Sequence, residues 1–500
     1  MAQAVEELRA LSAGAGEFLS GSPIGHYIGG GWQLSGDGRV GDVLDPSDGS
    51  VLATVAFGGE AEIDAACKAA ADAFPAWSGM PANERSVLLH RLADKLEAEA
   101  ETLAQLEALD VGKAIVNVES FDVPFGIEGI RYFANLAAQL RTDVALPLAH
   151  MDARTHLTPY GVCGFVFPWN FPFDLLVWGV APALAAGNTV VVKPSEVTPL
   201  STLYICKLME QIAFPAGVFN VVTGLGADAG AAIPRHPLVK RMSFTGSPEV
   251  GRLIGAASGA RPIPCKLELG GKGAAVVFDD VDVAATATAL AGAITFNTGQ
   301  VCCTATRWLL HEDIYDAFVA EVTERLSAVK VGPSLGAETE MGPLVSQAQV
   351  DRVLAYRAKG EAEGATVLLD GGLANVEGHE AGFFVTPYLL AGDDQNVCFR
   401  EEIFGPAAYV TKFRDEDAAI ASVNSLDYGL ANSVWTEDLE RANRVAEQMV
   451  AGNSWVNAHN VFAYGLPYGG VNLSGMGGGV NGPDTFTDYL RHQTIARPLG

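Results

Sequence analysis

The sequence predicts an α/β protein built on two doubly wound parallel sheets, and three observations lead to this fold class. The chain has 500 residues, 49% hydrophobic and 18% charged, so it is too long for one compact core and apolar enough to fill two or three domains. Short runs rich in Val, Ile and Phe alternate with helical patterns, which is typical of parallel sheets buried on both faces. These runs form two series that meet near residues 268–271.

Several segments lie outside the two series. Residues 1–30 are rich in Gly and Ser and predict a weakly ordered arm. Apolar residues at helical spacing then predict two helices, over residues 61–74 and 83–109, which would cover a sheet. Residues 138–158 and 484–498 have extended character, so we expect an excursion that could pair with another subunit.

The first series contains four expected strands, each followed directly by polar, Gly or Pro residues: 161–167, 189–192, 219–222 and 240–244. The uncharged stretch 175–192 is interrupted by Gly and Pro, so it predicts a buried helix and strand rather than a membrane span. Ligands bind at the carboxyl ends of the strands in such sheets, and these strand ends therefore predict a nucleotide site.

The second series runs from about residue 267 to about residue 470. It begins with an expected strand over residues 274–278, a helix over 283–297, a strand over 307–310 and a helix over 314–329.

Charge and motif content exclude several classes of function. Acidic residues outnumber basic ones 59 to 32, which gives a net charge of −27 and makes nucleic acid or a membrane surface an unfavourable partner. The seven cysteines show no C-x-x-C pair and the N-terminus has no export-signal pattern, so we expect a cytoplasmic protein. No His pattern predicts a metal site, and neither a serine-hydrolase nor a P-loop motif is present.

The glycine and charge signals of the first series are weak when each is taken alone. The run from Gly224 to Gly230, which includes Gly226, misses the dinucleotide spacing by one residue and favours a plain turn. Gly246 and Ser247 stand between a strand and a helix, where backbone N–H groups could meet a pyrophosphate. Lys193 and Glu196 could bind a ribose diol, or they could be a solvated charge pair.

Two residues are candidates for catalysis, and each has an ordinary alternative. Cys302 follows a Gly-containing break after an apolar helix, which gives a nucleophile an approach route, although most cysteines are buried and inert. Glu268 lies between apolar residues, where desolvation would suit a general base, or it is a surface charge at a domain junction.

Six motifs occur in order along the chain: Pro168-Trp-Asn-Phe-Pro172, Lys193-Pro-Ser-Glu196, Phe244-Thr-Gly-Ser247, Glu268-Leu-Gly-Gly-Lys272, Phe296-Asn-Thr-Gly-Gln-Val-Cys302 and Glu401-Glu-Ile-Phe-Gly-Pro406. Together they resemble the aldehyde dehydrogenase superfamily from about residue 25 to the C-terminus. The resemblance implies a homodimer or homotetramer whose subunit has an NAD-binding domain (1–137 and 159–267), a catalytic domain (268–470) and a small β oligomerisation segment (138–158 and 471–500).

The resemblance also implies a mechanism with three catalytic residues. Cys302 would attack the aldehyde carbon as a thiolate, and the Asn170 amide with the Cys302 N–H would hold the oxyanion. After hydride transfer to NAD, Glu268 would activate water to hydrolyse the thioester. A CoA-acylating enzyme is disfavoured because this base is present. The residues implied in cofactor binding are Trp169, Lys193, Ser195, Glu196, Gly226, Phe244, Gly246, Ser247, Leu269, Glu402 and Phe404, and Glu196 would favour NAD over NADP.

Two departures from the family pattern affect the base. Gly179 and Gly479 stand where many members carry Lys and Glu of a proton path beside the catalytic Glu. We therefore expect the relay of Glu268 to run through water or backbone, or deacylation to be slow. A non-catalytic, structural or binding member of the family is the alternative from another functional class.

The implied substrate pocket is rich in aromatic residues, which favours an aromatic or bulky apolar aldehyde over a charged semialdehyde. Asp174 in this pocket could accept a hydrogen bond from a ring hydroxyl, or could hold an ammonium, as in an aminoaldehyde or betaine-aldehyde dehydrogenase. The pocket residues are Phe171, Asp174, Leu175, Trp178, Phe296, Val301, Cys303, Phe462 and Tyr468.

Overall fold

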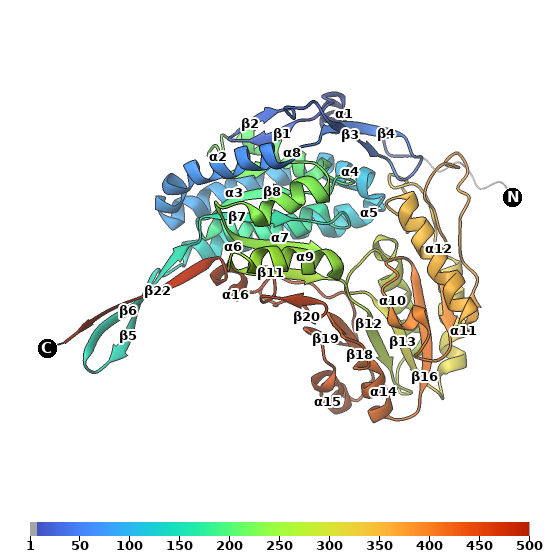
Figure 1. Cartoon of the computed structure of the whole chain (residues 1–500). Helices are drawn as coiled ribbons and strands as arrows, with labels where there is room; N and C mark the ends of the chain where they lie inside the picture. The colour runs from blue at the N-terminus through green and yellow to red at the C-terminus, as the bar shows by residue number, and fades with distance from the viewer. Residues whose placement is uncertain (1–7, 500) are drawn as a thin grey trace.

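The computed structural model describes residues 8–499 and arranges them around two large sheets and a projecting arm (Figure 1). In this described part the first sheet has the order β2-β1-β9-β8-β7-β10-β11-β21, and β9 to β11 run parallel. Its strands are β1 (His26–Ile28), β2 (Gly31–Gln33), β7 (Val162–Val166), β8 (Thr189–Lys193), β9 (Phe219–Val221), β10 (Val239–Gly246), β11 (Cys265–Leu269) and β21 (Gly475–Met476).

The first sheet is buried on both faces, as the sequence predicts. Along β8, Val190 and Val192 pack into one hydrophobic cluster and Val191 packs into another, because successive side chains of a strand point to opposite faces. One face contacts α2 (Glu60–Gly79) and α9 (Pro248–Gly259). The other cluster contains α3 (Ala82–Ala98), α4 (Ala100–Val111), α6 (Val123–Ala138), α7 (Pro172–Ala185) and α8 (Leu200–Gln211).

The strand order places a topological switch point between β7 and β10. The chain passes from β7 outward through β8 to β9, and then returns to the other side of β7 with β10 and β11. At such a point the carboxyl ends of two adjacent strands open a crevice that commonly receives a nucleotide. The segments after β7 and β10 are therefore the parts of this sheet best placed for a ligand.

The second sheet has the order β14-β15-β16-β13-β12-β18-β19, and all of its neighbours except β14 and β15 pair in parallel. Its strands are β12 (Gly273–Val277), β13 (Ala305–His311), β14 (Thr366–Leu369), β15 (Tyr388–Ala391), β16 (Ala407–Phe413), β18 (Ala431–Trp435) and β19 (Asn453–Val456). The accompanying helices are α10 (Val283–Thr295), α11 (Tyr315–Ser327), α12 (Gln347–Ala362), α13 (Val397–Arg400), α14 (Glu416–Val423) and α15 (Leu439–Gln448).

A three-stranded antiparallel arm projects from the body (Figure 1). It joins β5 (Asp143–Leu148), β6 (Met151–Pro159) and β22 (Leu490–Pro498), so both predicted excursions meet within one chain. Two small ladders complete the strands: β3 (Val40–Leu44) with β4 (Val51–Ala56), and β17 (Tyr428–Gly429) with β20 (Val471–Asn472).

Three expectations about local structure are wrong. The weakly ordered arm is, from residue 8 on, a packed segment with helix α1 (Ala13–Ser20), because its small residues allow close approach: a Cβ at Gly14 would lie 2.7 Å from Thr102 Oγ1. The single helix over 83–109 breaks at Glu99, which lets α4 turn and pack against α8. Residues 485–487 are helical, within α16 (Pro483–Thr487).

All seven cysteines are free thiols. Among residues 8–499, none of the helices is both long enough and apolar enough to cross a membrane.

Candidate active site

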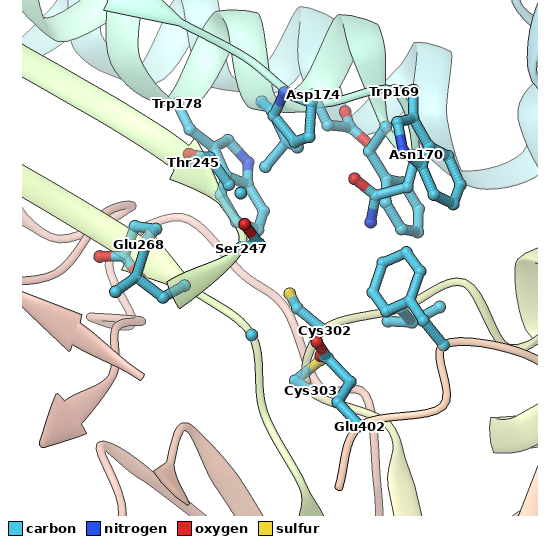
Figure 2. A pocket seen from close by; sticks show the side chains of 18 of the residues that line it. Trp169, Asn170, Asp174, Trp178, Thr245, Ser247, Glu268, Cys302, Cys303 and Glu402 are labelled. Atoms are coloured by element: carbon cyan, nitrogen blue, oxygen red, sulfur yellow. The ribbon is translucent and has the colours of Figure 1, made fainter. Parts of the chain in front are cut away.

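A cavity of about 280 Å³ lies between the two sheets (Figure 2). The first sheet contributes the segments after β7, β10 and β11, and the second contributes the loops that precede β13 and β16. The predicted residues that line it are Trp169, Asn170, Phe171, Asp174, Leu175, Trp178, Gly246, Ser247, Glu268, Leu269, Val301, Cys302, Cys303, Glu402, Phe404, Phe462 and Tyr468.

The loop that carries Cys302 has an unusual backbone. Asn297 and Thr298 have φ of 47° and 55°, a left-handed conformation that non-glycine residues rarely adopt. The buried Gln300 side chain fixes the turn, donating to the Asn297 carbonyl at 3.1 Å and accepting from the Val345 N–H at 3.0 Å. The loop ends with the Cys302 sulfur directed into the cavity (Figure 2).

The two adjacent cysteines have opposite environments. Hydrogen bonding from the Cys303 thiol and from the Tyr468 hydroxyl lowers the pKa of Cys302, although burial opposes this effect. The Cys302 Sγ to Tyr468 Oη distance is 3.5 Å. Burial raises the pKa of Cys303 well above its usual value, and its hydrogen bond with Cys302 raises it further. The Cys303 Sγ also lies 3.5 Å from Asn460 Oδ1. Cys302 is therefore the thiol suited to be a nucleophile.

Asn170 lies opposite this sulfur. The side-chain Nδ2 of Asn170 donates to the Gln300 backbone carbonyl at 3.0 Å, and the backbone carbonyl of Asn170 accepts from Asn297 Nδ2 at 2.8 Å. An amide nitrogen carries two hydrogens, so one stays available to a ligand. In Figure 2 this nitrogen and the Cys302 sulfur both point into the space between them.

Glu268 is buried in β11, and the backbone N–H of Gly470 favours its carboxylate form. Desolvation raises the pKa of Glu268 to about 8, and the nearby Lys266 ammonium partly opposes this rise. In Figure 2 the side chain points away from Cys302. A carboxyl group with such a pKa can hold and release a proton near neutral pH.

The remaining predicted cofactor residues follow neighbouring strands of the first sheet. Lys193 Nζ pairs with Glu196 Oε2 at 2.5 Å at the end of β8, and burial lowers the pKa of Lys193. Ser247 caps α9 by accepting from the Val250 N–H at 3.3 Å. On the opposite wall, Glu402 Oε1 accepts from the Gly271 N–H at 2.9 Å, and burial raises the pKa of Glu402 to about 7.

Some predicted site residues do not line the cavity. Phe296 lies one layer back, with its ring 5.9 Å from that of Phe171. Phe244 packs beneath Gly246, where a Cβ would meet its ring at 2.6 Å. The others lie beyond the cavity, at the end of β8 or in the segments after β8 and β9: Lys193, Ser195, Glu196 and Gly226.

Several lining residues are absent from the sequence-based prediction. Gln349 and Arg352 lie one turn apart on α12 and hold the loop before β16, donating to the Phe404 carbonyl at 2.6 Å and to the Ile403 carbonyl at 3.1 Å. Their one signal is a polar pair at helical spacing, which is common on any surface. The full set is Phe121, Pro168, Thr245, Gly270, Gln349 and Arg352, of which Pro168, Thr245 and Gly270 fall inside the quoted motifs.

The structure explains the two glycines that depart from the family pattern. A Cβ at Gly179 would lie 2.9 Å from the Phe165 ring, and one at Gly479 would lie 2.5 Å from the Tyr468 carbonyl oxygen. A larger side chain at either position would therefore require its neighbours to shift.

Asp174 lies on the cavity wall above a buried charge cluster. Burial raises the pKa of Asp174 well above its usual value, and the carboxylates of Asp122 and Glu107 raise it further. Lys113 pairs with Asp122 at 2.7 Å, and its Nζ lies 3.7 Å from the centre of the Phe171 ring. Burial and the two carboxylates outweigh the Lys113 ammonium, which favours the charged form, so the carboxyl group of Asp174 is held neutral.

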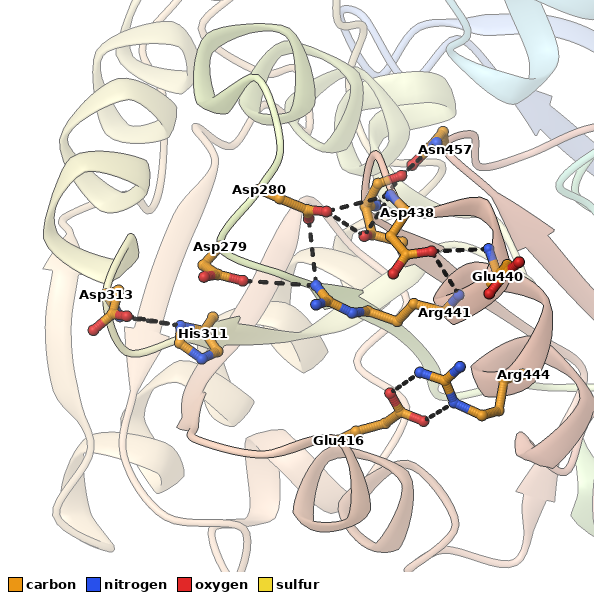
Figure 3. A network of polar contacts seen from close by, with 11 residues as sticks. Asp279, Asp280, His311, Asp313, Glu416, Asp438, Glu440, Arg441, Arg444 and Asn457 are labelled. Atoms are coloured by element: carbon orange, nitrogen blue, oxygen red, sulfur yellow. Dashed lines mark hydrogen bonds and ion pairs between the residues drawn. The ribbon is translucent and has the colours of Figure 1, made fainter.

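A separate polar network lies around the end of β13 (Figure 3). The ligand atoms of Asp279, His311 and Asp313 fall within 4.8 Å of one another. However, Arg441 lies 3.7 Å from both Asp279 and Asp280 and supplies positive charge to this cluster. The absence of a metal site therefore stays a prediction.

Comparison with known proteins identifies the family. A sequence model of the aldehyde dehydrogenase family matches residues 32–495. A putative aldehyde dehydrogenase, DhaS, from Bacillus subtilis is 39% identical over 456 residues, or 90% of this chain and 91% of that protein. The crystal structure of a putative aldehyde dehydrogenase from Burkholderia cenocepacia superposes with a TM-score of 0.93 at 42% identity, covering 96% and 98% of the two chains.

A third similar protein is betaine aldehyde dehydrogenase from Staphylococcus aureus, solved in complex with NAD⁺. It superposes with a TM-score of 0.94 at 32% identity and covers 97% of each chain. The order of the motifs, the cavity that unites them and these matches agree: the chain belongs to the aldehyde dehydrogenase family.

Proposed function

We propose that the protein oxidises an aromatic or bulky apolar aldehyde to the carboxylic acid with NAD, through a thioester on Cys302. The observation that carries this proposal is the position of the Cys302 sulfur. It points into an aromatic-lined cavity, beside a hydroxyl that lowers its pKa and opposite the Asn170 amide.

Acylation would begin with the thiolate form of Cys302, which hydrogen bonding from Cys303 and Tyr468 favours. The sulfur attacks the aldehyde carbon, and the Asn170 Nδ2–H and the Cys302 N–H hold the resulting oxyanion. NAD, when bound, supplies the hydride acceptor that turns the thiohemiacetal into a thioester.

The residues present fit a dinucleotide. The positive end of the α9 helix dipole, which Ser247 caps, would face a pyrophosphate. Glu196 would accept hydrogen bonds from a ribose diol and would repel a 2′-phosphate, which favours NAD over NADP. Glu402 would bind the second ribose through Oε2, because the Gly271 N–H donates to Oε1. Trp169 and Phe404, whose rings pack edge to face at 5.3 Å, would flank the nicotinamide side.

Deacylation would use Glu268 as the base. Its carboxylate takes a proton from water, the hydroxide attacks the thioester, and the carboxylic acid leaves while the Cys302 sulfur is regenerated. The pKa of about 8 means that only a part of the Glu268 population is ionised at neutral pH, so this step would accelerate as the pH rises.

The walls of the cavity support the aromatic or apolar substrate. Phe462 packs against Trp178 and Tyr468, with ring centres 6.0 Å and 5.5 Å apart, and the Trp178 and Tyr468 rings are 5.3 Å apart. A flat or greasy aldehyde would bury apolar area against these rings. The neutral form of Asp174 adds a hydrogen-bonding group without a charge.

An aminoaldehyde is the second candidate. The observation that favours it is that both carboxyl oxygens of Asp174 are buried at the cavity and lack a hydrogen-bond partner among the described residues. A substrate ammonium group would stabilise the ionised form of the Asp174 carboxyl group and would pack against aromatic faces. The similarity to a betaine aldehyde dehydrogenase is compatible with this candidate.

A comparison of kcat/KM for benzaldehyde and betaine aldehyde distinguishes the two candidates, with Asp174→Asn as the variant. The proposal expects benzaldehyde to be preferred, and expects the variant to change its kcat/KM by less than about threefold, because a neutral amide replaces a neutral carboxyl group. A preference for betaine aldehyde that falls about tenfold or more in the variant, as expected for loss of a buried charge pair, would establish the second candidate instead.

We further propose that the chain forms a homodimer or homotetramer through the arm. The strands β5 and β22 are its edges, and Val144 and Leu148 on β5 are about half exposed. An exposed apolar edge strand is a pairing surface. Light scattering of the purified chain tests this proposal, and the mass of a single chain would contradict it.

A further inference from the structure

The catalytic base shares its strand with a second buried ionisable group. Lys266 and Glu268 are two residues apart on β11, so their side chains leave the same face of the sheet. The Lys266 side chain is 1% exposed, and burial lowers its pKa. A buried ammonium two positions from a buried carboxyl group requires a reason, because burying a lone charge is costly.

The contacts of Lys266 connect it to solvent. Its Nζ donates to the carbonyl oxygen of Gly479 and lies 2.9 Å from Asp488 Oδ2. The Asp488 side chain is 34% exposed and also lies 3.9 Å from Arg241. Thr485 Oγ1 donates to the same Gly479 carbonyl at 3.1 Å. The ammonium is thus held between a backbone carbonyl and a carboxylate at the surface.

The other end of this arrangement is Glu268 itself. A Cβ at Gly469 would lie 3.2 Å from Glu268 Oε1 and 2.7 Å from the Cα of Gly479. The carboxyl group therefore lies against the crossing of the Gly469 and Gly479 backbones, and the Lys266 ammonium binds the carbonyl of that same Gly479. A side chain at Gly469 would fill this space.

We propose that Lys266, fixed by the Gly479 carbonyl and by Asp488, is the positioning residue that allows Glu268 to ionise and act as the base in thioester hydrolysis. Lys266 does not touch the substrate and acts through Glu268. The inference rests on the proposed function and names the group that compensates for the missing charges at Gly179 and Gly479.

The charges around Glu268 support this role. Two charged groups act on it: Lys266, from its own strand, favours the carboxylate, and the Cys302 thiolate, from the facing loop, opposes it. Asp488, which follows α16, raises the pKa of Lys266, and Arg241 on β10 lowers it. The Lys266 ammonium is thus the charge that favours the base form of Glu268.

The test is the pH dependence of steady-state turnover, measured beside the pre-steady-state burst of NADH, in Lys266→Met, Lys266→Gln and Lys266→Arg. Lys266→Gln keeps a donor for the Gly479 carbonyl and serves if the Met variant does not fold, which NAD binding and Tm report. Lys68→Met is the control, because it removes a lysine charge at a remote site, from the exposed ion pair of Lys68 with Asp64.

We expect the Met and Gln variants to move the rising limb of turnover upward by about one pH unit, which lowers turnover about tenfold at neutral pH. At pH values above the shifted rise, turnover should return toward the wild-type value. The amplitude of the NADH burst should not change. Lys266→Arg and Lys68→Met should keep the wild-type limb.

An unmoved limb, or a loss of equal size at every pH, would show that Lys266 is only a structural tie and would overturn the proposal. Absence of any NADH burst in the wild-type protein would instead refute the proposed function. The two failures are therefore distinguishable.

Discussion

Replacing Tyr468 by Phe tests how the site prepares its nucleophile. The Tyr468 hydroxyl lies 3.5 Å from the Cys302 sulfur and lowers the pKa of that thiol. Hydrogen bonds to charged groups contribute about 1.5–3 kcal/mol, and the length of this contact suggests the lower end. Since about 1.4 kcal/mol corresponds to one pKa unit, we expect the pKa of Cys302 to rise by about one unit in Tyr468→Phe.

The assay is the rate of iodoacetamide alkylation of Cys302 as a function of pH, because only the thiolate reacts. Below the pKa, the variant should react about tenfold more slowly than the wild type at the same pH. Cys302→Ala measures the background from the other cysteines. Tyr409→Phe is the matched control, because the Tyr409 hydroxyl is buried in the second sheet without a hydrogen-bond partner among residues 8–499. An unchanged pH midpoint in Tyr468→Phe would show that the Tyr468 hydroxyl does not stabilise the Cys302 thiolate.

Three further predictions concern the base, the backbone beside it and a glycine on a helix of the second sheet. Because the pKa of Glu268 is about 8, steady-state turnover should rise with pH through about 8. In Glu268→Gln this rise should disappear, while rapid-mixing absorbance should still show the NADH burst. A rise with pH that survives in the variant would contradict the role of Glu268 as the base. Gly479→Ala would place a Cβ 2.5 Å from a backbone carbonyl oxygen and should destabilise the fold by about 1–3 kcal/mol. Gly292→Ala, which meets nothing within 4 Å on α10, should stabilise it by about 0.5–1 kcal/mol, so calorimetry should show opposite shifts of Tm.

The fold follows closely from local patterns in the sequence. The apolar run of β8 specifies a strand buried on both faces, and the interrupted stretch before it specifies α7. The errors occur where a local pattern competes with packing: the Gly-rich segment at Gly14 becomes a close helix contact, and the helical pattern breaks at Glu99 so that α4 can reach α8.

The site is less accessible from sequence because it is built from distant residues. Tyr468 and Cys302 are 166 positions apart, and Lys266 and Gly479 are 213 positions apart, so no local spacing predicts either contact. The choice between the adjacent cysteines likewise depends on the burial of Cys303 and on the hydrogen bond from the distant Tyr468 hydroxyl to Cys302. The motifs identify the participants, and only the fold shows which side chains meet.

The most direct test of the central claim is the production of NADH by the purified protein with NAD and benzaldehyde, without CoA, and with Cys302→Ala as the blank. We expect sustained NADH production that is lost in the variant. One equivalent of NADH per subunit followed by a stall would mean that acylation proceeds but that Glu268 fails as a base. No NADH from the wild-type protein would contradict the aromatic-aldehyde assignment.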